Sequence, residues 1–120
     1  MTLTVRDATF SGDVTRSLDL DFAAERVTVR EIIAARVRQE VGAYNAERAG
    51  EAFDGLVQPA TPGAREVDAE RQVYVALDAF QKNGFFVLVD DLQAESLEQL
   101  VRLRPGTEVS FVKLTPLVGG

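Results

Sequence analysis

The sequence predicts a single α+β domain, and three observations support this prediction. The first 22 residues alternate apolar and polar side chains with a period of two, which is typical of paired strands. From Thr28 the period becomes three or four, as in an amphipathic helix. An apolar run at 85–89 and an alternating segment at 108–114 then predict further strands. Strands on both sides of a helix, within 120 residues, favour one α+β domain.

The N-terminal part is expected to form a β-hairpin. Leu3–Phe10 and Val14–Phe22 are the two strands, and Ser11–Asp13 contains the Gly that a turn favours. Arg16 is the one charged residue on the apolar face of the second strand. The other residues expected on that face are Val14, Leu18, Leu20 and Phe22.

A long helix is expected to follow the hairpin. Thr28 and Glu31 have the spacing of a capping box, in which each side chain accepts a hydrogen bond from the other residue's backbone N–H. Val27 and Ile32 are placed for a hydrophobic staple across this helix start. The predicted buried stripe is Val29, Ile33, Val37, Val41 and Tyr44.

Residues 46–83 are predicted to be an insertion made of a loop and a second helix. Gly and Pro punctuate the first part, and we expect 52–65 to be the most mobile internal segment. Asp68 has the position of an N-cap for the second helix, and Asn83-Gly84 is a typical helix stop.

The last third of the chain predicts two clear strands. Phe85–Val89 is too short for a helix and suits a buried central strand, whereas 96–103 is ambiguous. Glu108–Leu114 is the final strand, with Val109 and Phe111 inward. The outward side chains are then Ser110, Val112 and Leu114. Residues 115–120 are expected to be a flexible C-terminal tail of the single domain 1–120.

The composition excludes several classes of function. The sequence has no Cys and no His, which removes thiol chemistry, the commonest general base and the commonest zinc ligand. No catalytic residue and no metal site is therefore predicted, and Asp90-Asp91 is interpreted as a solvated turn. A net charge of −6 argues against nucleic acid or an anionic membrane as a partner. The first residues lack the features of a signal peptide, so a cytoplasmic location is expected.

Two stretches resemble the ubiquitin-like β-grasp proteins. Val27–Ile33 is similar to the helix start of the prokaryotic sulfur carriers of molybdopterin and thiamine synthesis. Pro105–Phe111, followed by a tail that ends in Gly-Gly, resembles those carriers and ubiquitin. The resemblance covers roughly 1–45 and 84–120. It implies a mixed β-grasp sheet packed on one main helix, with the helical insertion placed before the third strand.

The resemblance also implies a function for the tail. In these families an activating enzyme adenylates the α-carboxylate of the last residue, which here is Gly120. Gly119 and Gly120 are thus the implied adenylation and conjugation residues, since glycine lets a tail enter a narrow channel. The protein would be a modifier rather than an enzyme, and would need no cofactor. Its implied partners are the activating enzyme, a conjugating enzyme, a deconjugating protease and target proteins.

Two alternatives stay open beside the modifier. The first is a sulfur carrier that forms a C-terminal thiocarboxylate, although the insertion and the longer 112–115 segment depart from the sulfur carriers. The second is an interaction domain whose tail is never activated. Outward apolar side chains near the tail predict a docking patch for a partner. The patch consists of Val112, Leu114 and Leu117.

Overall fold

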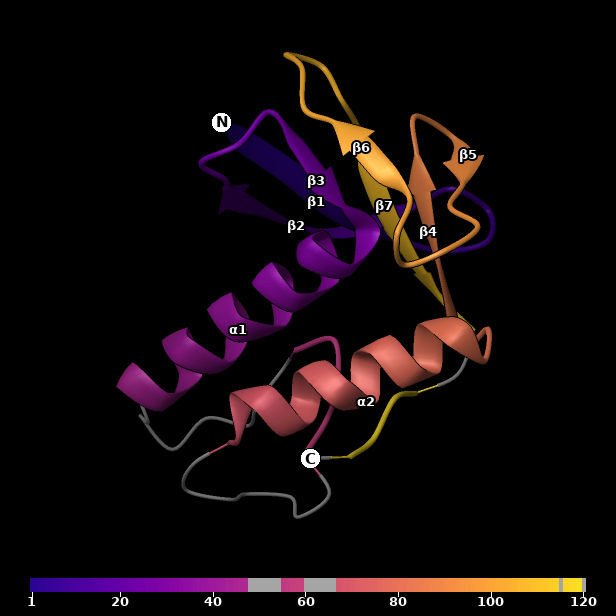
Figure 1. Cartoon of the computed structure of the whole chain (residues 1–120). Helices are drawn as coiled ribbons and strands as arrows, with labels where there is room; N and C mark the ends of the chain where they lie inside the picture. Colours follow the sequence, from indigo (N-terminus) through magenta and orange to yellow (C-terminus); the bar gives the residue numbers. More distant parts are fainter. Residues whose placement is uncertain (48–54, 60–66, 115, 120) are drawn as a thin grey trace.

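The computed structural model describes residues 1–47, 55–59, 67–114 and 116–119. Within these residues the chain forms a five-stranded mixed sheet, a two-stranded sheet and two helices (Figure 1). In chain order the elements are β1 (Thr2–Ala8), β2 (Val14–Asp21), β3 (Arg26–Thr28), α1 (Val29–Glu47), α2 (Ala69–Gln81), β4 (Phe85–Val89), β5 (Leu92–Gln93), β6 (Leu100–Arg102) and β7 (Val109–Lys113). The α+β prediction is confirmed.

The large sheet has the strand order β2-β1-β7-β4-β5. β1 and β7 run parallel at its centre, and the other neighbouring pairs are antiparallel. Both helices lie below this sheet in the view of Figure 1. The small sheet pairs β3 with β6, so the segment that leads into α1 is held by the chain just before β7. In the large sheet, the first and last strands of the chain, β1 and β7, are neighbours near the centre.

The predicted hairpin is confirmed with one irregularity. The register of β1 and β2 shifts between Asp7 and Ala8, so that Ala8 pairs with Val14. A bulge of this kind changes the face on which the following side chains lie. Val14 was expected to be buried and is exposed, which corrects that prediction, whereas Leu20 is buried as expected.

The capping box at the start of α1 is confirmed. The Thr28 N–H donates to Oε1 of Glu31 at 3.0 Å, and the Glu31 N–H donates to Oγ1 of Thr28 at 3.1 Å. The next N–H groups, of Val29 and Arg30, donate to backbone carbonyls in the loop before β6. The helix therefore begins with its first donors satisfied, as a stable N-terminus requires. It continues past Gly42 to Glu47.

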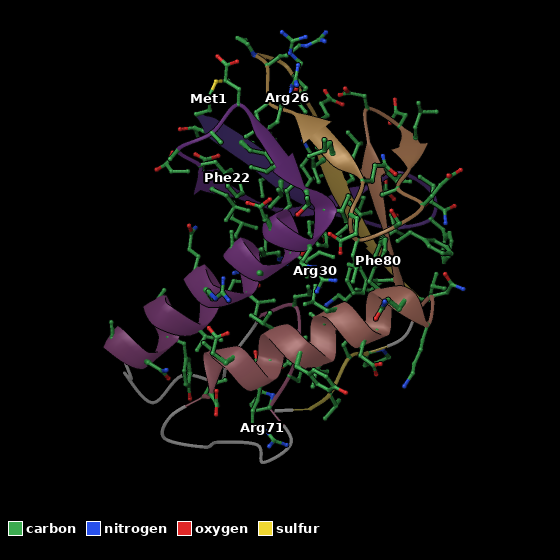
Figure 2. The ribbon with its side chains drawn as sticks, viewed as in Figure 1. Met1, Phe22, Arg26, Arg30, Arg71 and Phe80 are labelled. Atoms are coloured by element: carbon green, nitrogen blue, oxygen red, sulfur yellow. The ribbon has the colours of Figure 1, made fainter. Side chains whose placement is uncertain are left out.

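The second helix also has the predicted ends. Asp68 caps α2 by accepting a hydrogen bond from the Arg71 N–H at 3.1 Å. After Gln81, Asn83 adopts a positive φ of 60° and the Gly84 N–H donates to the Ala79 carbonyl at 2.7 Å. Side chains fill the space between the helices and the sheet, and Figure 2 shows Phe80 on the sheet side of α2. Within the described residues, no helix is long and apolar enough to cross a membrane.

The core is built by the inward faces of the sheet and both helices. Of the side chains predicted to be inside, Leu18, Phe22 and Tyr44 are only half-buried. Those that are fully buried as expected include Val5, Leu20, Ile33, Val87 and Phe111. The ring of Phe111 stacks on that of Phe85, with 5.8 Å between centroids, and Phe85 meets Phe80 edge-on at 5.9 Å. β7 is thus attached to α2 through a row of three aromatic rings.

Replacement of Phe111 tests the register of β7. Phe111→Ala removes a buried ring and leaves a cavity, so the free energy of unfolding should fall by about 3–5 kcal/mol. Phe10→Ala is the matched control, because Phe10 is exposed and its truncation should change stability little. Urea unfolding monitored by circular dichroism measures both. A loss below about 1 kcal/mol for Phe111→Ala would contradict the assignment of this residue to the core.

Candidate functional site

The chain after β7 returns along α2 and pairs with a segment of the insertion (Figure 1). The Gln58 N–H donates to the Leu117 carbonyl at 2.7 Å, and the Gly119 N–H donates to the Gln58 carbonyl at 2.8 Å. These two bonds flank Val118 and form a parallel β-bridge between Gln58 and Val118. Residues 116–119, which we call the tail, are therefore held by backbone pairing. Gly120 lies outside the described residues.

Side chains of the tail alternate between buried and exposed. Leu117 is 7% exposed and belongs to the core cluster, whereas Val118 points away and is exposed. Burial of a leucine side chain contributes about 1.5–3 kcal/mol. A Cβ added to Gly119 would lie only 2.8 Å from Cγ2 and 3.1 Å from Cγ1 of Val75 on α2. Position 119 therefore needs glycine in this arrangement, independently of any partner.

The segment that receives the tail is itself firmly packed. Leu56 and Val57 are each buried. The Leu56 N–H donates to Oε1 of Glu40 on α1 at 3.1 Å. In the described part, 55–59, two apolar side chains enter the core, although 52–65 is expected to be the most mobile internal segment; its mobility stays a prediction. The rest of that prediction falls on residues outside the described ones.

Glu40 belongs to a buried cluster of charges around Arg36. The Arg36 side chain is fully buried and its guanidinium forms a bidentate ion pair with Asp7 on β1, with Nη2 donating to Oδ2 at 2.8 Å. Its Nε donates to Oε1 of Glu40 at 3.1 Å. Oε2 of Glu40 lies 3.3 Å from Nη1 of Arg16 on β2, and the guanidinium lies 4.7 Å from the centroid of the Phe111 ring.

Arg36 stays charged within this cluster. Burial opposes its charge, but the hydrogen bond to Asp7 and the negative charges of Glu40 and Asp7 together raise the pKa of Arg36 above its ordinary value. The cation thereby compensates the carboxylate of Asp7 and, together with Arg16, the buried carboxylate of Glu40.

Arg36 and Glu40 were not predicted to lie in the core, although the sequence contains a signal for their cluster. They are four residues apart and fall on the same helical face as Ile33 and Val37, which are buried. An oppositely charged i, i+4 pair on an apolar face indicates a buried ion pair rather than a solvated one. Arg16, the charged exception on the apolar face of β2, is exposed and pairs with Glu40 at the edge of this cluster.

The predicted docking patch is only partly exposed. Leu114 is 37% exposed, but Val112 is 5% exposed, so the expectation that Val112 faces solvent is wrong. β7 lies between β1 and β4, and Val112 is flanked by Ala8 on one side and Phe86 on the other. Apolar neighbours on a central strand cover one another even on a face without helices. Leu117 is turned into the core and is equally unavailable to a partner.

A shallow hollow of about 330 Å³ remains at the base of the tail. It is lined by Leu56, Gln58, Lys113, Leu114, Pro116 and Leu117. Leu114 is thus the one member of the predicted patch that is both exposed and next to the tail. Among the described residues, no group of three or more Asp or Glu side chains is placed to hold a metal ion.

Replacement of Arg36 tests whether the buried charge cluster stabilises the fold that positions the tail. Arg36→Met should lower the free energy of unfolding by about 3–5 kcal/mol, because it leaves the partly buried Asp7 without its cation and leaves Arg16 as the remaining cation beside the buried Glu40. Arg38→Met is the matched control: Arg38 is on the same helix and pairs with Glu70 at the surface, where solvent screens the interaction. Urea denaturation compares them. Equal effects of the two changes would show that the buried cluster contributes no more than a surface pair.

Comparisons with known proteins give no relative from which a function could be transferred. No protein-family model matches the chain, and neither the curated proteins nor the solved structures include a significant match. A functional proposal therefore depends on the fold, the tail and their chemistry.

Proposed function

We propose that this chain is a ubiquitin-like protein modifier of the cytoplasm, activated by adenylation of the Gly120 carboxylate. The observation that carries the proposal is the position of the Gly-Gly pair. Gly119 and Gly120 follow the central strand β7 after a short segment, and β7 pairs in parallel with β1. A tail that leaves the middle of such a sheet is the arrangement that ubiquitin-like proteins present to an activating enzyme.

The strand order supports a β-grasp fold. A hairpin, β1 and β2, is followed by α1, and the last strand returns to pair with the first. β4 adds to the free edge of β7, and β5 adds to β4. α2 then occupies the place of an insertion between the main helix and the third strand of the large sheet. This is the arrangement that the resemblance of 27–33 and 105–111 implies.

The chemistry required of this chain is modest. A free carboxylate on Gly120 attacks the α-phosphorus of ATP, which forms an acyl-adenylate and releases pyrophosphate. A thiolate of the activating enzyme then attacks the carbonyl carbon and releases AMP, which leaves a thioester. The sequence contains no Cys, so the partner must supply this thiol. The chain contributes a reachable carboxylate and a surface that positions it.

Leu114 is the best candidate for that positioning surface. It is exposed, it follows β7 directly, and it lines the hollow at the base of the tail together with Pro116. An exposed apolar group beside a reactive terminus suits a docking contact. Val112 and Leu117 act indirectly in this proposal, since both are buried and fix the strand and tail beside Leu114.

A second candidate is favoured by one observation. The tail is paired with Gln58 and anchored by Leu117, as expected if it serves only to complete the fold. The chain would then be a β-grasp interaction domain whose Gly120 is never activated. Truncation of the tail separates this candidate, the modifier and the sulfur carrier.

Removal of Gly119-Gly120 tests the proposed function. In the presence of a cognate activating enzyme, the full chain should support ATP–pyrophosphate exchange, and the truncated chain should not. The truncation removes one described hydrogen bond, from Gly119, so the free energy of unfolding should change by only about 0.5–1.5 kcal/mol. Val118→Ala is the control, because it trims an exposed side chain in the same tail and leaves both glycines.

Mass spectrometry of the product distinguishes the candidates. An isopeptide or ester link to a target supports the modifier. Replacement of one terminal oxygen by sulfur supports the sulfur carrier. Exchange that is equal for the full and truncated chains, or absent from both, would contradict activation at Gly120 and favour the interaction domain.

The docking role of Leu114 is tested by a charge on its side chain. Leu114→Asp should weaken binding to the activating enzyme by at least about 1 kcal/mol, the usual threshold for an important interface residue, and should leave unfolding unchanged. Leu92→Asp is the matched control, because Leu92 is more exposed and lies on β5 at the edge of the sheet. Isothermal titration calorimetry measures both affinities. Equal affinities would remove Leu114 from the interface.

A further inference from the structure

Part of the insertion forms a small clasp that holds the tail. We define the clasp as Leu56, Val57 and Gln58 together with Val75 on α2. Gln58 uses both of its backbone groups on the tail, accepting from Gly119 and donating to the Leu117 carbonyl. This pairing leaves the tail in an extended conformation against the body of the protein.

Two contacts make the clasp selective for its occupant. Leu117 enters the core, where its Cδ2 lies 3.4 Å from the position that a Cβ on Gly84 would take. Two residues later, Gly119 lies against Val75 so closely that a Cβ would meet Cγ2 at 2.8 Å. A large apolar side chain followed, after one residue, by glycine is the pattern that fits. The tail sequence Leu117-Val118-Gly119 has this pattern.

The clasp has a fixed base. The Leu56 N–H is held by Glu40, whose carboxylate is held in turn by Arg36. Leu56 and Val57 are buried, so the strand-like segment that carries Gln58 cannot follow the tail if the tail moves away. The movable partner of the pair is therefore the tail.

In the closed state the tail is not free to enter the active site of another protein. The Gly119 N–H is bound to the Gln58 carbonyl, and Leu117 is held in the core. If the tail leaves the clasp, the seven residues 114–120 become available and can span up to about 23–25 Å. An enzyme that takes the terminal residues into a channel needs the second state.

We propose that the clasp is an autoinhibitory contact, which must open before an enzyme can engage Gly120. The consequence for adenylation depends on the proposed function, but the closed and open states do not. Val75 is the selecting residue: it admits glycine at position 119 and excludes any residue with a Cβ. The insertion thereby regulates access to the end of its own chain.

The experiment compares variants that share the same tail. Carboxypeptidase Y, which must accept the terminal residues in an extended form, serves as the probe, and mass spectrometry follows release of Gly120. Val75→Phe fills the place of Gly119 without changing the tail, and should raise the cleavage rate by the inverse of the open fraction of the wild type, which is about twofold or more when the two states have similar free energies. Leu100→Phe is the control, because Leu100 is exposed on β6, which is paired with β3 rather than with the tail.

A compensating pair keeps the test independent of Val75→Phe, which could disturb α2. Gly119→Ala should open the clasp, because its Cβ collides with both methyl groups of Val75. Adding Val75→Ala to this variant removes those methyl groups and leaves the Val75 Cβ 3.5 Å away, which is an ordinary contact. Cleavage of Gly119→Ala should therefore be fast. Cleavage of Val75→Ala/Gly119→Ala should be slower, but not as slow as in the wild type, because φ at position 119 is +159°, an angle that favours glycine.

These outcomes separate the clasp from the proposed function. Equal cleavage of wild type and Val75→Phe, or no slowing when Val75→Ala is added to Gly119→Ala, would overturn the clasp whatever the activating enzyme does. Faster cleavage of Val75→Phe than of wild type, together with slower cleavage of the compensated pair than of Gly119→Ala, would support the clasp even if ATP–pyrophosphate exchange showed that Gly120 is not adenylated.

Discussion

The guanidinium of Arg36 is the group on which the rest of the structure depends. It joins β1 through Asp7 and β7 through the ring of Phe111, from a position on α1 that solvent does not reach. Each contact alone connects two elements, and together they set the main helix against the central parallel pair of strands. Such a cluster adds less to stability than its Coulomb energy suggests, because desolvation of the charges opposes it. Its contribution is to define one arrangement, since a shifted helix would leave buried carboxylates without a cation.

The same cluster reaches the tail through a short chain of contacts. Arg36 fixes Glu40, Glu40 accepts the Leu56 N–H, and two residues later Gln58 pairs with the tail. The buried charge therefore positions a segment that has little secondary structure of its own. This explains how an insertion rich in Gly and Pro can present a fixed edge for backbone pairing. The candidate site is built by the core of the domain and not by a separate loop.

The sequence predicted those elements whose signals are local. The capping box at Thr28 and Glu31 and the cap at Asp68 depend on residues three positions apart, and the strand at 85–89 is a continuous apolar run. β3, β5 and β6 have only two or three residues, too few to show a period, and they form because pairing across the fold stabilises them. The bulge after Asp7 and the burial of Val112 are set by neighbouring strands.

The tail was predicted by its glycines. Its pairing with Gln58 depends on a contact between segments about 60 residues apart, which no local pattern encodes.

Glycine at position 119 satisfies two constraints that act in different states. In the open state, under the proposed function, the absence of a side chain would let the backbone pass through the channel of an activating enzyme. In the closed state, the same absence lets the tail approach Val75. The closed state gains two hydrogen bonds, of about 0.5–1.5 kcal/mol each, and the burial of Leu117, of about 1.5–3 kcal/mol. Ordering the backbone of the four residues 116–119 costs about 1–2 kcal/mol for each residue. The gain and the cost are similar, so the clasp is expected to be reversible, and a partner that binds the tail even moderately better than Gln58 and Val75 do can open it.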